Sequence, residues 1–119
     1  MVKLVDANVI LRYLLGDHPD MSESARQIIN LGAFTVPEVI AEVVYVLKGV
    51  YQVERKEIGE TLTDFLDEIE IDNKEVMKEA LYLFGDTLLD FVDCILIARH
   101  RILKEEIASF DKKLNRMLE

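Results

Sequence analysis

The sequence holds little of the material from which special structural classes of protein are built. Its 119 residues include one cysteine, two prolines, five glycines and no tryptophan. One cysteine cannot form an internal disulfide, and so few prolines and glycines exclude collagen-like and linker-like chains. Apolar runs are also short, because none approaches the roughly 18 residues of a membrane span. We therefore expect a globular protein with no membrane segment.

Basic residues are scarce relative to acidic ones. The chain has 14 lysines and arginines against 23 aspartates and glutamates, which gives a formal net charge of −9. A protein that binds nucleic acid through its own charge normally carries a basic face. The balance therefore weighs against tight non-specific binding of nucleic acid. It leaves cleavage open, since an enzyme that reaches a phosphate through a bound metal can be acidic overall.

The length and the hydrophobic content predict one domain over residues 1–119. Domains most often contain about 100–150 residues, and half of these residues are hydrophobic, which suits a compact core. The single Cys94 lies in an apolar run, as expected of a reduced thiol. The apolar stretch at residues 1–5 is too short for the core of a signal peptide. We therefore expect a cytoplasmic protein.

Short apolar runs alternate with segments of helical periodicity along the chain. Strands are expected at residues 4–5, 33–36, 69–71 and 107–110. Helices are expected at residues 7–15, 22–31, 36–50, 56–69, 74–84, 91–103 and 112–118. Thr35 and Glu38 have the spacing of a capping box at the start of the third helix. The alternation predicts an α/β fold, a three-layer α/β/α sandwich around a central parallel sheet of about four to five short strands.

Four acidic residues stand at the ends of the predicted strands or in the predicted helices: Asp6, Glu42, Asp93 and Asp111. Asp6 and Asp111 follow strands directly, and ligands of parallel sheets bind beyond the carboxyl ends of the strands. Carboxylates that converge repel one another unless a hard divalent cation such as Mg²⁺ or Mn²⁺ neutralises them. The arrangement indicates metal-dependent phosphodiester chemistry.

Each acid also has a simpler explanation. Asp6 and Asp111 precede helices and fit the N-cap position equally well, and capping is the better interpretation of Asp90. Glu42 lies on the flank of a valine stripe, where lone acids are usually solvated. Asp93 is harder to dismiss, because a carboxylate among apolar neighbours needs something to pair with it. The case for a site rests on the set of acids.

Four short segments, each containing one of these acids, carry a family resemblance. They are residues 5–8, 36–43, 90–98 and 109–114. With these segments in this order and at these separations, nearly the whole chain resembles the PIN-domain ribonucleases. In size and layout it is similar to the VapC-like toxins of bacterial and archaeal toxin–antitoxin pairs.

The resemblance implies a central parallel sheet, a pocket of acids that binds Mg²⁺ or Mn²⁺, and cleavage of single-stranded RNA. It also implies a homodimer and an antitoxin protein whose tail blocks the site. In this interpretation Asp6 and Asp93 are the main metal ligands. Glu42 and Asp111 act as further ligands, mostly through water, or orient the attacking water.

Several other side chains have candidate supporting roles. Asn8 and Ser109 are expected to hold a ligand carboxylate or the neighbouring loop in place, although ordinary turn and capping chemistry also explains them. Candidates for contact with phosphate are Arg12, Lys48, Arg99 and Lys112.

Two other functions compete with the nuclease hypothesis. The first is a PIN-like scaffold that binds RNA or a protein partner and cleaves nothing; acids at all four motif positions argue against it. The second is an aspartate-based phosphatase with Asp6 as nucleophile. Such enzymes typically need a second acid two residues later, and Asn8 occupies that position.

Overall fold

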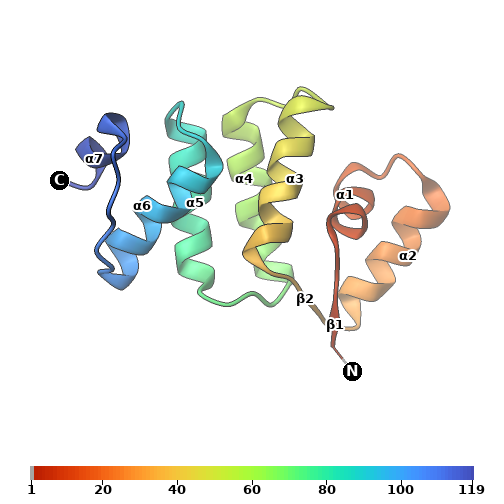
Figure 1. The fold of residues 1–119 in the computed structure, drawn as a ribbon. Coiled ribbons are helices and arrows are strands. Elements are labelled where there is room, and N and C mark those ends of the chain that lie inside the picture. The colour runs from red at the N-terminus through yellow and green to blue at the C-terminus, as the bar shows by residue number, and fades with distance from the viewer. Residues whose placement is uncertain (1) are drawn as a thin grey trace.

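The structure is a computed structural model that describes residues 2–119. Helices dominate it, and α1 and α2 lie at one end of the molecule, α6 and α7 at the other, with α3, α4 and α5 between them (Figure 1). In chain order the elements are β1 Lys3–Leu4, α1 Ala7–Leu15, α2 Pro19–Asn30, β2 Ala33–Phe34, α3 Pro37–Gly49, α4 Arg55–Phe65, the 3-10 helix η1 Leu66–Glu68, α5 Lys74–Asp86, α6 Phe91–Leu103 and α7 Lys112–Met117. Within this described part, no helix is long and apolar enough to cross a membrane.

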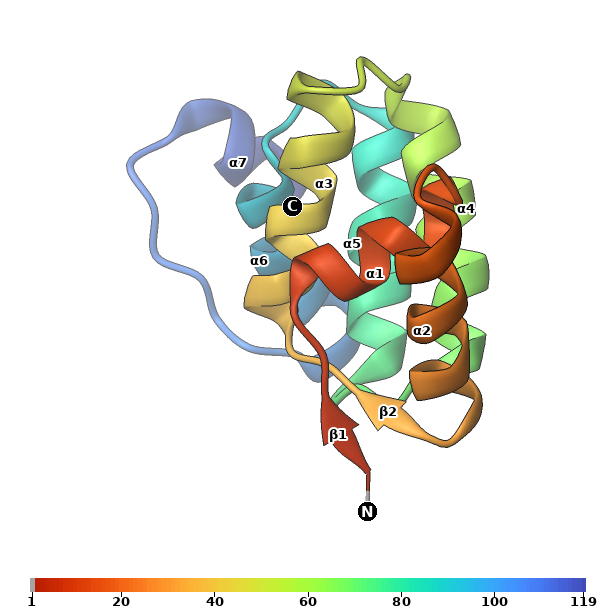
Figure 2. The ribbon, with the colours of Figure 1, turned by 90° about the vertical axis from the view of Figure 1, so that its right-hand side faces the viewer.

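A small parallel sheet joins the first two strands, which lie side by side in Figure 2. β1 pairs with β2 so that Lys3 faces Ala33 and Leu4 faces Phe34. Glu70 adds one parallel bridge to Phe34 on the other side of β2. The predicted mixed α/β content and the parallel pairing are confirmed. The predicted number of strands is not, since the structure has two short strands and one bridge within residues 2–119.

The strand predicted at residues 107–110 is wrong. Backbone groups in and next to this segment form hydrogen bonds with side chains instead of with another strand. The Asn115 side chain donates to the Ser109 carbonyl at 2.9 Å, and the Asp111 N–H donates to Ser109 Oγ at 2.9 Å. A nitrogen of His100 lies 2.8 Å from the Glu105 carbonyl oxygen. The segment is therefore an irregular connection that loops outside the helices in Figure 2, with Phe110 fully exposed.

The predicted capping box at Thr35 is also wrong. α3 begins at Pro37 with Val36 at the N-cap position. Proline suits the first helical position because its fixed φ is already helical and the N–H it lacks would have no partner there. Thr35 instead donates its hydroxyl to the Val5 carbonyl at 3.3 Å. This bond ties the chain just after β2 to the chain just before Asp6.

The backbones of α4 and α5 approach very closely. A Cβ atom built on Gly59 would lie 2.7 Å from the Leu81 carbonyl oxygen, and one built on Gly85 would lie 3.3 Å from the Lys56 Cα. Beside this crossing the core contains the fully buried Phe65 and Phe91. The size of the two glycines therefore sets the distance between these helices.

The close crossing predicts that Gly59→Ala destabilises the protein. Overpacking against a backbone oxygen, which cannot rotate away, costs about 1–3 kcal/mol. Alanine recovers up to about 1 kcal/mol over glycine within a helix. We expect a net loss of about 1–2 kcal/mol in the free energy of unfolding, measured by urea denaturation.

Gly49→Ala is the matched control, because a Cβ on Gly49 meets nothing within 4 Å. Its stability should be unchanged or slightly raised. Equal stabilities for the Gly59 and Gly49 variants would contradict the crossing.

Candidate functional site

The structure gathers acids around the first turn of α6. Asp93 is partly buried there, between the fully buried Phe91 and Cys94. Burial raises the pKa of the Asp93 carboxyl group, and the negative charges of Asp111 and Asp90 raise it further. None of the ion pairs found among residues 2–119 includes any of these three acids. The start of α6 therefore carries negative charge that no neighbouring cation offsets.

Aromatic packing fixes the start of α6. The Phe91 ring meets the Phe84 ring of α5 edge-on, with centroids 5.8 Å apart and planes at 86°. Cys94 lies one turn further into the core, and its burial raises the pKa of its thiol to about 11. This agrees with its expected role as a core residue. With Phe91 and Cys94 turned inward, Asp93 stands at the boundary between core and solvent.

Asp90 was missed as a member of this group by the sequence analysis, which favoured it as a helix cap. It does occupy the N-cap position of α6, but its side chain makes no capping hydrogen bond. Its carboxylate is exposed, and its negative charge contributes to the raised pKa of Asp93. The spacing of Asp90 and Asp93, three residues apart at a helix start, was the available signal.

Asp111 comes to this region because α7 packs back on α6. Leu114 of α7 is buried, and a nitrogen of His100 lies 3.1 Å from the Leu118 carbonyl oxygen. Asp111 caps α7, since its Oδ1 accepts from the N–H groups of Lys113 at 2.8 Å and Leu114 at 3.1 Å. The capping explanation is thus confirmed, and it uses one oxygen of the carboxylate.

Asp6 is also a cap. Its Oδ1 accepts from the Val9 N–H at 3.0 Å at the start of α1. Its position is fixed by the chain before it, because the Val5 N–H donates to the Phe34 carbonyl at 3.0 Å. α1 and α6 lie on opposite sides of the central helices in Figure 1. Asp6 is therefore held firmly at the start of α1, and it is not among the charges that raise the pKa of Asp93.

The four predicted acids do not converge in this structure. Glu42 is exposed on α3. The carboxylates that act on Asp93 are Asp111 and Asp90, and neither Asp6 nor Glu42 contributes. In the described chain, residues 2–119, no three histidine, cysteine, aspartate or glutamate side chains are grouped closely enough to hold a metal ion. The structure thus brings Asp93 and Asp111 into electrostatic range and adds Asp90.

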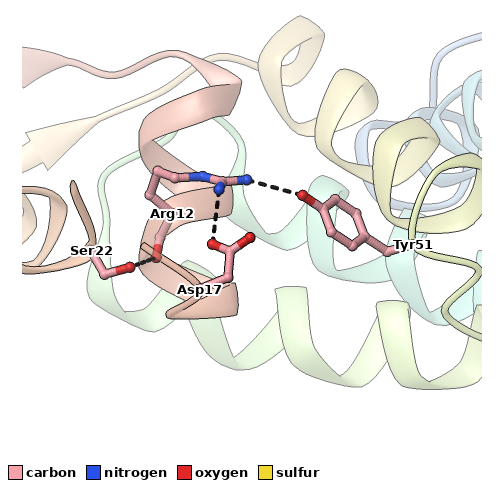
Figure 3. Close-up of polar contacts among 4 residues, drawn as sticks. All are labelled: Arg12, Asp17, Ser22 and Tyr51. Carbon is pink, nitrogen blue, oxygen red and sulfur yellow. Dashed lines mark hydrogen bonds and ion pairs between the residues drawn. The ribbon is translucent and has the colours of Figure 1, made fainter. Parts of the chain in front are cut away.

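Two of the four candidate phosphate contacts are engaged elsewhere. Arg12 is buried and donates to Asp17 at 2.8 Å and to the Tyr51 hydroxyl at 3.1 Å, as Figure 3 shows. The guanidinium of Arg99 pairs with both carboxylate oxygens of Glu105. These arginines hold the fold together and are poorly placed to meet a phosphate. The exposed members of the set are Lys48 and Lys112.

The two predicted supporting residues differ in what they do. Ser109 accepts the Asp111 N–H, so it holds the backbone next to that acid; its hydroxyl does not contact the carboxylate. Asn8 is exposed near the start of α1, where it lines a cavity of about 260 Å³ between α1 and α2. Ser109 therefore stabilises a turn. Asn8 lies two residues after Asp6, and its supporting role stays a prediction.

The chemistry of the acids around Asp93 fits a hard divalent cation. Mg²⁺ binds oxygen ligands and usually takes one or two carboxylates, several waters and a substrate phosphate. Asp93 and Asp111 are two such carboxylates, and the pKa of Asp93 is raised first by burial and then by the negative charges of Asp111 and Asp90. Their oxygen donors are therefore of the kind that Mg²⁺ or Mn²⁺ binds, and within residues 2–119 no third potential ligand is grouped with them.

Comparison with models of known protein families identifies this chain's family. Residues 3–118 match the PIN domain family, which is almost the whole chain. No curated protein matches the sequence.

The environment of Asp93 predicts how stability depends on pH without metal. Because the folded state raises its pKa, ionisation of Asp93 destabilises the folded protein as pH rises above the ordinary aspartate value of about 3.9. In EDTA, Asp93→Asn should therefore be more stable than the wild type at pH 7. The difference should vanish below about pH 3.9, which urea denaturation at both pH values checks. A variant that is less stable throughout would show that Asp93 serves mainly to stabilise the start of the helix.

Proposed function

The chain belongs to the PIN domain family, whose members are typically metal-dependent nucleases, and on this premise we propose that it is an endoribonuclease dependent on Mg²⁺ or Mn²⁺. It hydrolyses phosphodiester bonds of RNA and is the VapC-like toxin of a toxin–antitoxin pair. The observation that carries the proposal is Asp93, a partly buried carboxylate that faces like charges without a cationic partner. Favourable interaction with the positive end of α6 explains an acid at this position, but it does not explain why two further carboxylates face it.

The acids have separate roles in the proposed site. Asp93 and Asp111 hold the cation through carboxylate oxygens, and Asp90 strengthens the negative field around them. Asp6 and Glu42 remain proposed members of the site through the family motifs; in a substrate complex that brought them to Asp93 they would orient the attacking water or hold a second cation, a grouping that residues 2–119 do not show here. A bound divalent cation supplies Lewis acidity towards a phosphodiester oxygen and makes water a usable nucleophile near neutral pH.

The protein supplies orientation and contact around the cation. Phe91 and Cys94, both fully buried, keep water away from the inner side of Asp93 and hold its backbone in place. Lys112 directly follows Asp111 and is exposed, so it is proposed to contact the RNA phosphate. Lys48 on α3 is proposed to make a second phosphate contact. Neither lysine is needed for folding in this scheme.

The proposed partners follow from the same premise. Besides its RNA substrate, the protein binds an antitoxin whose tail blocks the acidic site. It forms a homodimer and works in the cytoplasm. The excess of acidic over basic residues supports a blocking segment of opposite charge, because complementary charge favours association.

A second candidate function is a non-catalytic PIN-like scaffold that binds RNA or a protein. The observation that favours it is that, within residues 2–119, no three potential ligand side chains are grouped closely enough to hold a metal ion. Absence of any metal affinity would support this scaffold.

The proposal predicts metal-dependent RNA cleavage that depends on Asp93. Purified protein should cleave a mixed pool of structured RNAs with Mn²⁺ or Mg²⁺, and EDTA should abolish cleavage. Asp93→Asn should lower the rate by more than about 100-fold, because loss of even an indirect partner of a metal ligand costs about 10–100-fold. Gel analysis of the RNA fragments measures the rate.

Asp72→Asn is the matched control, because Asp72 is exposed and lies outside the group around Asp93. It should cleave like the wild type. Equal cleavage by the Asp93 variant would indicate a contaminating nuclease. Failure of the wild type to bind metal by calorimetry would favour the scaffold.

A further inference from the structure

Arg55 of α4 connects, through its side chain, the end of α5 to the segment just before α6. It is the first residue of α4, and its guanidinium lies over the Phe84 ring, 3.8 Å from the ring centroid. Nε donates to the Phe84 carbonyl at 2.9 Å, and Nη2 donates to the Leu89 carbonyl. One side chain thus holds both ends of the turn that leads into α6.

The close crossing of α4 and α5 makes this reach possible. Gly85 sits against the backbone of Arg55 and Lys56, where a Cβ would lie 3.5 Å from the Arg55 carbonyl oxygen. α4 therefore begins directly beside the last turn of α5. A larger residue at position 85 would push apart the two helix ends that Arg55 joins.

Thr87 supports the same turn from within. Its hydroxyl donates to the Leu83 carbonyl at 2.7 Å and accepts the Leu89 N–H at 3.2 Å. The backbone at Leu89 is thus held through its N–H by Thr87 and through its carbonyl by Arg55. Asp90 follows immediately, and Asp93 lies one turn further on. The direction of both carboxylates depends on how this turn is fixed.

Within residues 2–119 the positive charge of Arg55 is not paired with a carboxylate. Its guanidinium binds two carbonyl oxygens and an aromatic face, and none of the ion pairs in the described chain includes it. It therefore orders the start of α6 without neutralising the acids there. Lysine carries its three donors on one nitrogen, so it lacks the planar fork in which Nε and Nη2 reach the two carbonyls while the guanidinium lies over the Phe84 ring.

We propose that Arg55 is a positioning residue, which bridges the Phe84 and Leu89 carbonyls and so holds the start of α6, and with it the Asp93 carboxylate, in the orientation that the proposed cation site needs. The inference rests on the proposed function, because it assigns Arg55 to the same site. Arg55 contacts neither the cation nor the RNA. It acts only through the turn at residues 87–90.

Two substitutions test this role. Arg55→Lys keeps the positive charge and removes the double bridge, and Arg55→Ala removes both. Arg101→Lys is the matched control, since Arg101 also joins α6 to α5, through Glu79 at 2.9 Å, far along the helix. Mg²⁺ affinity of the full chain is measured by isothermal titration calorimetry, well below the melting temperature of each variant.

Both Arg55 variants should bind Mg²⁺ about 10–100-fold more weakly than the wild type, as expected when an indirect partner of a metal ligand is lost. Arg101→Lys should bind like the wild type. A lower melting temperature with unchanged Mg²⁺ affinity in Arg55→Lys would overturn the proposal, because that result describes a merely structural residue.

Amide chemical shifts without metal separate this inference from the proposed function. In Arg55→Lys the shifts of residues 92–94 should change, and in Arg101→Lys they should not. Changes confined to residues 83–91, which adjoin the two carbonyls that Arg55 binds, would overturn the positioning role. If the wild type binds no Mg²⁺, the proposed function fails, and the shifts still decide whether Arg55 orders the start of α6.

Discussion

Gly59 and Gly85 let the backbones of α4 and α5 approach until no side chain separates them. That approach places the first residue of α4 beside the last turn of α5, and Arg55 closes the junction. α6 begins just after Leu89, whose carbonyl Arg55 binds, and the Phe91 ring at its start packs against the Phe84 ring of α5. The position of the acids on α6 is therefore decided by two small residues on other helices, neither of which could take part in any chemistry.

The arginines and the exposed lysines of this chain have different roles. Arg12, Arg99 and Arg101 each pair with a carboxylate, and Arg55 binds carbonyl oxygens. The chain has few basic residues, and Arg12, Arg55 and Arg101 each join segments that lie far apart in the sequence. Asp93 is left without a cationic partner. In such a protein, attraction for a phosphate has to come from a bound cation and a small number of exposed lysines.

Local periodicity predicted the helices well, because α1, α6 and their neighbours bury one face at regular spacing. It failed for residues 107–110, since a run of four residues, three of them apolar, does not show whether the backbone will pair with a strand or with side chains such as Asn115. The site was predicted in part for the same reason. The apolar neighbours of Asp93 mark it as unusual in any sequence, whereas its distance from Asp6 depends on how whole helices pack. No local pattern contains that information.

The sheet has an open side. Within the described chain β1 pairs only with β2, so the other side of β1 presents unpaired peptide groups, with Leu4 and Val2 both about half exposed. An edge of this kind invites pairing with other chains and is a recurrent origin of aggregation. Here the strand has two residues, and Lys3 and Asp6 place charges at or beside its ends. So short and charged an edge offers too few hydrogen bonds to template the open-ended stacking of a fibril.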